Sequence, residues 1–248
     1  MQPTRTIPRL AMNDVKLIGR DAFLVYGLAY SLGMAMIMRF ALPYLNGYFA
    51  ENQVLPFPLS DIYPMFFVWT AVLLGAGLPG VVFGFLLLDE KDDNTLKAML
   101  VTPLPLGFYV AYRVGVPMLI GVIMTVVVVL IAGVAVPPWW QLALLAVGAS
   151  LFAPICALFF AGYAENRVQG FALAKFPGIL SMLLTISWFV GEPLQLLFGL
   201  LPPYWVVKAY WLALEDNPLW VGSLLLGIVL QGAVVVYLAR RFEQVAYD

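Results

Sequence analysis

Six apolar runs, each long enough to cross a lipid bilayer, occupy most of this 248-residue sequence. A membrane-crossing helix needs roughly 20 consecutive apolar residues. The runs are continuous rather than alternating, which disfavours the strands of a membrane barrel. The predicted spans are residues 22–44, 62–88, 114–136, 141–163, 177–199 and 219–239. The chain is therefore predicted to be an all-α membrane protein with one domain, residues 1–248, containing six transmembrane helices.

Composition supports a membrane protein. Hydrophobic residues make up 63% of the chain and charged residues 11%, whereas a water-soluble domain usually carries about a quarter charged residues. One water-soluble core of this size cannot bury so much apolar surface, so membrane lipid must cover part of it. The net charge of −1 gives no indication of a nucleic-acid partner. Polar residues at positions 1–21, followed by a run too long for a signal core, argue against a cleaved signal peptide.

The cationic residues predict the orientation. Of the 13 lysines and arginines, only Lys208 lies on one side and Arg39 lies inside a span, which leaves eleven on the other side. That side carries both termini, residues 89–113 and the loop 163–176, and an excess of cations marks the cytosolic side. We expect a multi-pass protein of the cell (inner) membrane with both termini cytosolic. Two termini on one side require an even number of spans, in agreement with six.

The segment 89–113 is a charged insert between the second and third predicted spans. Two aspartates and an asparagine near its start can cap a helix and favour its positive end. Leu96, Met99 and Leu100 follow at helical spacing and form one apolar face. Pro103 lacks an amide donor and ends the helix. A short helix at the membrane surface is one interpretation; a solvated loop with a capped turn is the other.

The stretch Glu90-Lys91-x-x-x-Thr95-Leu96-x-x-Met99-Leu100-Val101-Thr102-Pro103-Leu104 resembles the cytosolic coupling helix of type-2 ABC exporter permeases. In that family the helix docks into a cleft on a partner ATPase. The resemblance implies an ATPase-coupling role for Glu90, Asp93, Thr95, Leu96, Met99, Leu100, Thr102 and Pro103. Asn94 and Lys97 depart from the family, which often has glycine and an acidic residue there, and this affects the subfamily assignment most.

Two further segments carry the resemblance less specifically. Asn13-Asp14-Val15-Lys16-Leu17-x-x-Arg20-Asp21 is similar to the N-terminal elbow helix of the family, which implies an interfacial helix at 8–21. Pro202-Pro203-Tyr204-Trp205-x-x-Lys208-Ala209-x-Trp211 looks like the segment before the last span in permeases of the drug or fluoroquinolone export group.

The family resemblance implies a function. The chain would be the permease subunit of an ATP-driven exporter, paired with a second permease copy as a homodimer or heterodimer. It would move an apolar or amphipathic substrate, drug-like or lipid-like, by alternating access. ATP and magnesium would bind the cytosolic ATPase partner, and this chain would bind no cofactor and catalyse no reaction.

The missing residue types are consistent with that division of work. The chain contains no histidine and one cysteine, which leaves zinc, haem and Cys/His nucleophile schemes without their ligands or bases. No Gly-Lys dipeptide occurs, so the chain lacks a GxxxxGK[ST] phosphate-binding loop. One alternative is a non-transporting assembly or regulatory subunit that binds a soluble partner through the same cytosolic helix. Another, disfavoured without histidine, is an intramembrane enzyme acting on lipid through Glu192.

Arg39 and Glu192 are the ionisable residues well inside apolar runs. A charge in hydrocarbon costs at least a few kcal/mol unless it pairs or reaches water. Both lie at a similar depth near the outer leaflet, so they snorkel outward independently, or they pair or line an outer gate.

The fifth predicted span is interrupted by Gly191-Glu192-Pro193. We expect the chain to break there and to form a re-entrant outer-leaflet segment before the sixth span, which needs protein or water around its backbone. The aromatic residues of this region equally fit an interfacial aromatic belt. In the resembling family the second and fifth spans border the cavity, which makes Trp69, Trp188 and Phe189 candidates for substrate contact, although lipid-packed spans would look the same.

Overall fold

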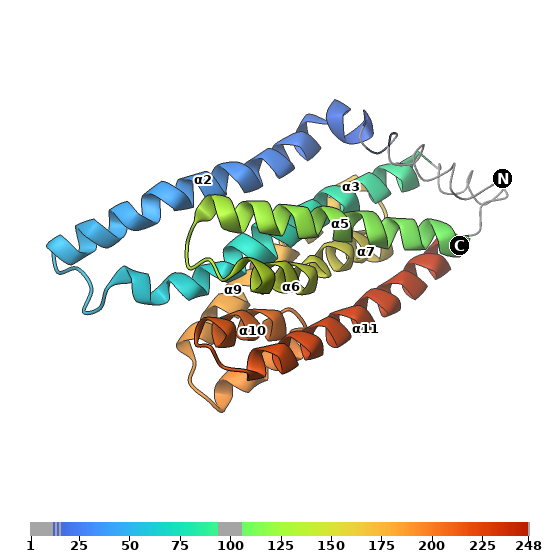
Figure 1. Cartoon of the computed structure of the whole chain (residues 1–248). Helices are drawn as coiled ribbons and strands as arrows, with labels where there is room; N and C mark the ends of the chain where they lie inside the picture. Colours follow the sequence, from blue (N-terminus) through green and yellow to red (C-terminus); the bar gives the residue numbers. More distant parts are fainter. Residues whose placement is uncertain (1–11, 13, 15, 94–105, 248) are drawn as a thin grey trace.

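The structure, a computed structural model, describes residues 12, 14, 16–93 and 106–247. Within these residues the chain is helical, without a strand, and six helical segments are long and apolar enough to cross a membrane. They are Ala22–Glu51, Leu59–Asp92, Gly107–Ala132, Trp139–Tyr163, Arg167–Phe189 and Leu219–Gln244. The all-α fold with six candidate spans is thus confirmed, and the helices form an elongated bundle (Figure 1).

Several spans consist of more than one helix. The single-helix spans are α2 (Ala22–Glu51), α5 (Leu106–Ala132) and α11 (Leu219–Tyr247). The second span joins η1 (Leu59–Phe66), η2 (Val68–Gly77) and α3 (Leu78–Asp92), and the fourth joins α6 (Trp139–Ser150) and α7 (Phe152–Tyr163). The fifth joins α8 (Arg167–Leu173), α9 (Phe176–Ile186) and η3 (Ser187–Phe189). Two short helices, η4 (Leu194–Leu200) and α10 (Tyr204–Leu214), precede the sixth span.

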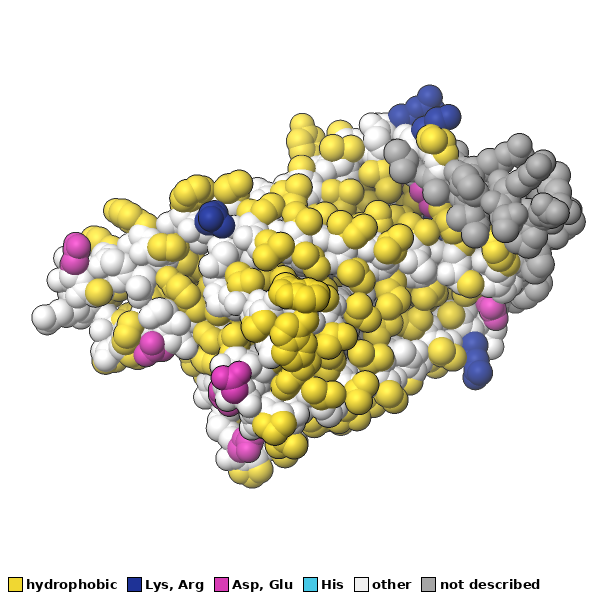
Figure 2. Space-filling model, viewed as in Figure 1, with side chains coloured by type: hydrophobic (Ala, Val, Ile, Leu, Met, Phe, Trp, Pro, Cys, Tyr) yellow, Lys and Arg dark blue, Asp and Glu magenta, His cyan; other side chains and the backbone are white. Residues whose placement is uncertain are grey.

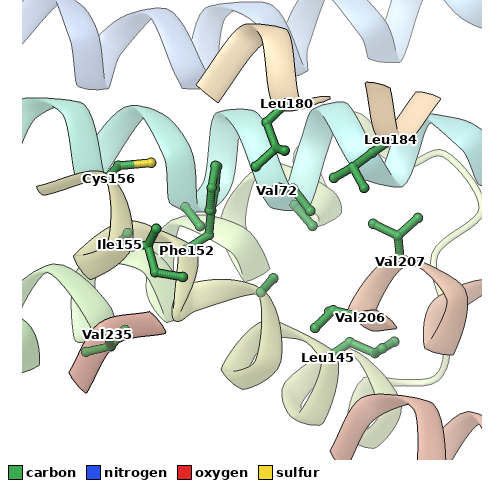
Figure 3. Packing of buried hydrophobic residues seen from close by; sticks show 14 of the residues in the cluster. Val72, Leu145, Phe152, Ile155, Cys156, Leu180, Leu184, Val206, Val207 and Val235 are labelled. Carbon is green, nitrogen blue, oxygen red and sulfur yellow. The ribbon is translucent and has the colours of Figure 1, made fainter. Parts of the chain in front are cut away.

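The second and fourth spans form the centre of the bundle. Most of their residues are buried, whereas only a minority of the residues in the first, third and sixth spans are buried. Phe152 and Cys156 of α7 lie in one continuous cluster with Val72 of η2, Leu180 of α9 and Val206 of α10 (Figure 3). Because this cluster joins elements from four parts of the chain, burial of apolar surface stabilises the packing of these elements against one another.

Two glycines allow the central helices to approach closely. A Cβ atom added at Gly80 would lie 2.5 Å from the carbonyl oxygen of Ala153, and one at Gly84 would lie 2.8 Å from the Phe160 ring. The two glycines are four residues apart, so both lie on the face of α3 that packs against α7. This small-residue face is therefore used for packing within one chain.

Residues Val68–Gly77 form a π-helix, which the sequence did not predict. Apolar periodicity cannot distinguish a π-helix from an α-helix over one or two turns. The π-helix packs against α5, where Thr125 Oγ1 donates to the carbonyl oxygen of Ala71 at 3.3 Å. Pro79, which lacks an amide donor, occupies the first turn of α3 directly after it.

The fifth span is corrected at both ends, because the helical segment covers Arg167–Phe189 instead of 177–199. It begins earlier because the Asn166 side chain caps α8 by accepting from the Gln169 amide at 3.1 Å. It ends at Phe189, after which Val190 is extended, so the helix stops just before the Gly191-Glu192-Pro193 interruption at which the sequence predicted a break. Residues 194–214 form η4 and α10, and their insertion into the outer leaflet stays a prediction.

The surface matches a membrane-embedded bundle. Hydrophobic side chains cover much of the visible face between the two ends, and most visible charged side chains lie towards the ends (Figure 2). Large exposed apolar side chains include Tyr26 and Phe40 of α2 and Leu225 and Val229 of α11. Such continuous apolar surface is expected where lipid or another membrane chain contacts the helices. The protein is thus a multi-pass membrane protein.

Candidate functional site

A buried arginine joins three parts of the chain at one end of the bundle. Arg113 of α5 donates from Nη1 to Oδ2 of Asp14 at 3.0 Å and from Nη2 to Oε1 of Glu90 in α3. All three side chains are buried, and Arg113 is only 1% exposed. Glu90 and Arg113 lie near the two ends of the predicted coupling segment 89–113, so this cluster joins the two ends of that segment.

Two tyrosines of α5 complete the hydrogen bonding of this cluster. Tyr109 accepts from Arg113 Nε at 3.0 Å and donates to Oε2 of Glu90. Tyr112 donates to Oδ2 of Asp14 at 2.7 Å. The second carboxylate oxygen of Asp14 is buried without a partner among the described residues. One guanidinium therefore serves two carboxylates, and the hydroxyl groups offset part of the cost of burying them. We refer to these five residues as the Arg113 cluster.

A second arginine, Arg167, also contacts the last turn of α3. Arg167, at the start of α8, contacts Asp89 at 3.1 Å through Nη1 and pairs with Asp21 through Nη2. Its backbone amide donates to Oδ2 of Asp92 at 3.2 Å. These side chains are about one quarter to one third exposed, so the pairs are screened more than those of the Arg113 cluster. We refer to Arg167, Asp21 and Asp89 as the Arg167 cluster.

Asp21 also starts the first membrane helix. Its Oδ1 accepts from the backbone amide of Phe23 at 2.8 Å, which caps α2. Burial alone would raise the pKa of Asp21, but its hydrogen bond to Arg167, the Arg167 charge and the helix amides outweigh burial and hold the pKa below its usual value. Asp21 is therefore an anion at neutral pH that joins α2 to the fifth span.

A cavity of about 750 Å³ lies beside these clusters. Its lining residues are Leu17, Arg20, Asp21, Ala22, Leu86, Asp89, Glu90, Asp92, Asp93 and Arg167. Half of the lining residues are acidic, but among the described residues no group of histidine, cysteine, aspartate and glutamate is arranged to hold a metal ion. The notable property of this region is therefore the set of ionic contacts between helices.

The predicted coupling residues divide into two groups. Thr95, Leu96, Met99, Leu100, Thr102 and Pro103 lie outside the described residues. Asp93 is exposed, directly after the last residue of α3. Glu90 is 5% exposed and bonds to Arg113 and Tyr109, which gives it contacts inside the chain rather than on the surface. The sequence did not indicate Asp14, Tyr109, Tyr112 or Arg113.

Arg39 and Glu192, for which pairing was one of the alternatives, do not contact each other. Arg39 donates to the carbonyl oxygen of Ile131 at 3.1 Å, at the end of α5. Glu192 instead accepts from Lys208 of α10 at 2.9 Å, and Lys208 also donates to Gln195 at 2.7 Å. Each charge therefore has its own partner, which leaves no pair between the two, and a role for either residue at an outer gate stays a prediction.

The three aromatic candidates lie in different surroundings. Trp69 and Trp188 are half-buried against the main core, while Phe189 is exposed. Trp188 packs edge-on against Trp211, with ring centroids 4.9 Å apart, and Trp211 donates to the carbonyl oxygen of Pro64. The contacts of Trp188 thus hold the end of the fifth span against α10, and a substrate role for all three stays a prediction.

Comparison with known proteins identifies the family. The family model "Fluoroquinolones export permease protein Rv2686c-like" matches residues 14–239. This chain belongs to that permease family. Two similar relatives are the fluoroquinolones export permease proteins Rv2686c of Mycobacterium tuberculosis strain H37Rv and MT2760 of strain CDC 1551 / Oshkosh. Each is 31% identical over 246 residues, which cover 96% of this chain and 94% of the relative. No solved structure matches the chain.

Membership of the Rv2686c-like family confirms the resemblance to exporter permeases. The match begins at residue 14, so it includes Asp14 and the other residues of both clusters. It also shows that the chain is an export-permease homologue with membrane helices, a component of a transport system.

Proposed function

We propose that this chain is the membrane subunit of an ATP-driven drug exporter, with amphipathic drugs of the fluoroquinolone class as candidate substrates. The proposal rests mainly on the similarity to the two mycobacterial relatives, which extends over almost the whole of each chain and whose names specify fluoroquinolone export. An amphipathic drug suits a bundle with few charges inside its spans, because a charged group in hydrocarbon is costly.

ATP would bind a separate cytosolic ATPase. The chain has no GxxxxGK[ST] loop of its own, so a nucleotide-driven cycle needs another protein. The predicted coupling helix in 89–113 supplies the contact, with Leu96, Met99 and Leu100 as the docking surface. The cation excess supports a cytosolic location for this end and for both termini. The end of α3, the start of α5 and the end of α11 lie at one end of the bundle (Figure 1), as this orientation requires.

Transport would proceed by alternating access. ATP binds one state of the ATPase pair more tightly than the other, and this difference in affinity supplies the work for the conformational change. A second permease copy, identical or related, would complete the pathway. The exposed apolar faces of the outer helices offer enough surface for a second copy and for lipid.

Leu96→Asp tests the coupling role directly. A carboxylate on the apolar face would have to be desolvated in the docked complex, so we expect loss of ATPase binding or of drug-stimulated ATP hydrolysis. Leu96→Met, which keeps an apolar side chain of similar volume, is the matched control and should retain activity. The measurements are drug accumulation in cells and ATP hydrolysis by the co-purified complex. Normal drug-stimulated hydrolysis in Leu96→Asp would refute the proposed docking surface.

If the purified chain moves drug across liposomes without any ATPase, the ATP-driven mechanism is wrong. If it binds an ATPase that drugs never stimulate, the chain is instead a regulatory subunit that uses the same helix.

A further inference from the structure

The Arg113 cluster links segments that are distant in the sequence. Asp14 belongs to the N-terminal helical residues, Glu90 to the end of α3, and Arg113 to the start of α5. Every guanidinium nitrogen of Arg113 has a hydrogen bond: Nη1 to Asp14, Nη2 to Glu90 and Nε to Tyr109. An arginine offers its donors in a rigid planar fork, so its bonds fix directions as well as distances.

The composition of this cluster is poor for stability alone. Two carboxylates and one guanidinium are buried together, and the desolvation of buried ions can exceed their mutual attraction. Apolar side chains of similar volume would fill the same space at least as favourably. What the ions provide is orientation, since the planar fork and both tyrosine hydroxyls bond to carboxylates in fixed directions.

The Arg167 cluster strengthens this argument. Asp14 and Asp21 are seven residues apart, and Asp89 and Glu90 are adjacent in α3. The N-terminal residues Asp14 and Asp21 are therefore each tied to the end of α3, by Arg113 from α5 and by Arg167 from α8 respectively. Arg113 is fully buried, whereas Arg167 is 31% exposed, so the Arg113 contacts are less weakened by water.

We propose that Arg113 is a positioning residue. It holds the N-terminal residues around Asp14, the end of α3 and the start of α5 together as one rigid unit. The importance of this unit for export rests on the proposed function. A force applied by the ATPase to the segment 94–105, which connects α3 and α5, would then move α3, α5 and the start of α2 together. Without Arg113 the same force would move α3 relative to the N-terminal residues, and the helices would no longer move together.

The first test needs no ATPase. Spin labels at cysteines replacing the exposed Lys16 and Asp93, in a Cys156→Ala background, report the distance between the N-terminal residues and the end of α3 in lipid nanodiscs. We expect one narrow distance peak in the otherwise unchanged chain and loss of that peak in Arg113→Gln. Arg113→Lys, which keeps the charge but not the fork, should recover it only in part. Arg241→Gln is the matched control, since Arg241 bonds to the carbonyl oxygen of Gly162 and should leave the peak unchanged.

Tyr112→Phe covers the case in which Arg113→Gln fails to fold. It removes one hydroxyl bond to Asp14 and keeps the ring, so we expect a broadened peak in a folded chain. Unchanged peaks in both Tyr112→Phe and any folded Arg113→Gln would overturn the proposal.

The second test measures export. At equal membrane levels, Arg113→Gln should lose drug export and drug stimulation of the co-purified ATPase while the ATPase still binds, and Arg113→Lys should restore part of both. Full export by folded Arg113→Gln would overturn the positioning role. If the spin-label result holds while the unaltered chain shows no ATP-driven export, the proposed function fails and the rigid unit stands.

Discussion

At the scale of single residues, the closest helix contacts give the sharpest expectation. Gly80→Ala would place a methyl group 2.5 Å from a backbone oxygen of Ala153, which cannot move aside as a side-chain end can. We expect a loss of about 1–3 kcal/mol in stability, because overpacking forces the backbone of α3 and α7 apart. Gly232→Ala is the control, since nothing lies within 4 Å of a Cβ atom there. Thermal unfolding in detergent measures both, and equal stability of the two variants would contradict the close packing.

The role of a single residue is easier to predict from the sequence when that role depends on its near neighbours in the chain. The small-residue pair Gly80 and Gly84 is recognisable from its spacing alone, and the structure shows which helix it contacts. Arg113 is not recognisable in this way, because its partners Asp14 and Glu90 are 99 and 23 residues away. Likewise Arg39 and Glu192 have similar predicted depths, but each found a nearer partner after folding. Depth in the membrane gives one coordinate, whereas pairing also requires the position around the bundle.

At the scale of helices, the ion pair between Asp21 and Arg167 should make the stability of the folded chain depend on pH. Its pKa is lower in the folded chain than in the unfolded one, so folding favours the carboxylate and the unfolded chain binds the proton more tightly. The stabilisation is present at neutral pH and is lost as the pH falls below about 4, the ordinary range of aspartate. Asp21→Asn keeps a good capping residue but loses the ion pair with Arg167.

We therefore expect Asp21→Asn to be less stable than the unaltered chain at pH 7 and to approach it as the pH falls through the acid range. Asp61→Asn, at an exposed position in η1, is the control. Thermal unfolding of nanodisc samples at a series of pH values provides the measurement. A constant difference between Asp21→Asn and the unaltered chain across that series would show that the ion pair with Arg167 contributes nothing.

Helix boundaries depend on features that average hydropathy does not capture. Five of the six predicted spans overlap the observed helices over most of their length, because twenty apolar residues have few other stable states in a membrane. The fifth span begins ten residues earlier than predicted because Asn166 caps a helix whose first turns are too polar for a hydropathy criterion. The π-helix in the second span, which packs against α5, is likewise not encoded by any local apolar pattern.

At the scale of the whole molecule, fold class and family were predictable and the internal connections were not. Composition and six apolar runs suffice for an all-α membrane bundle, since water-soluble alternatives cannot bury this much apolar surface. The coupling motif suffices for the exporter-permease family, which the match over residues 14–239 confirms. The two arginine clusters arise only when the ends of four helices meet, so they require the folded arrangement.

The orientation of the whole bundle gives the last prediction. The cation excess and the common location of the ends of α3 and α11 predict that Asp93 faces the cytosol, while Asn52 and Glu215 face outward. Each of these positions is exposed, so a cysteine there is accessible to reagent. In a Cys156→Ala background, a membrane-impermeant maleimide should label cysteine at Asn52 or Glu215 in intact cells. It should label cysteine at Asp93 only after permeabilisation. The chain with its native Cys156, which is buried, is the control for background labelling. Labelling of Asp93→Cys in intact cells would place 89–113 outside and remove the basis for an ATPase partner.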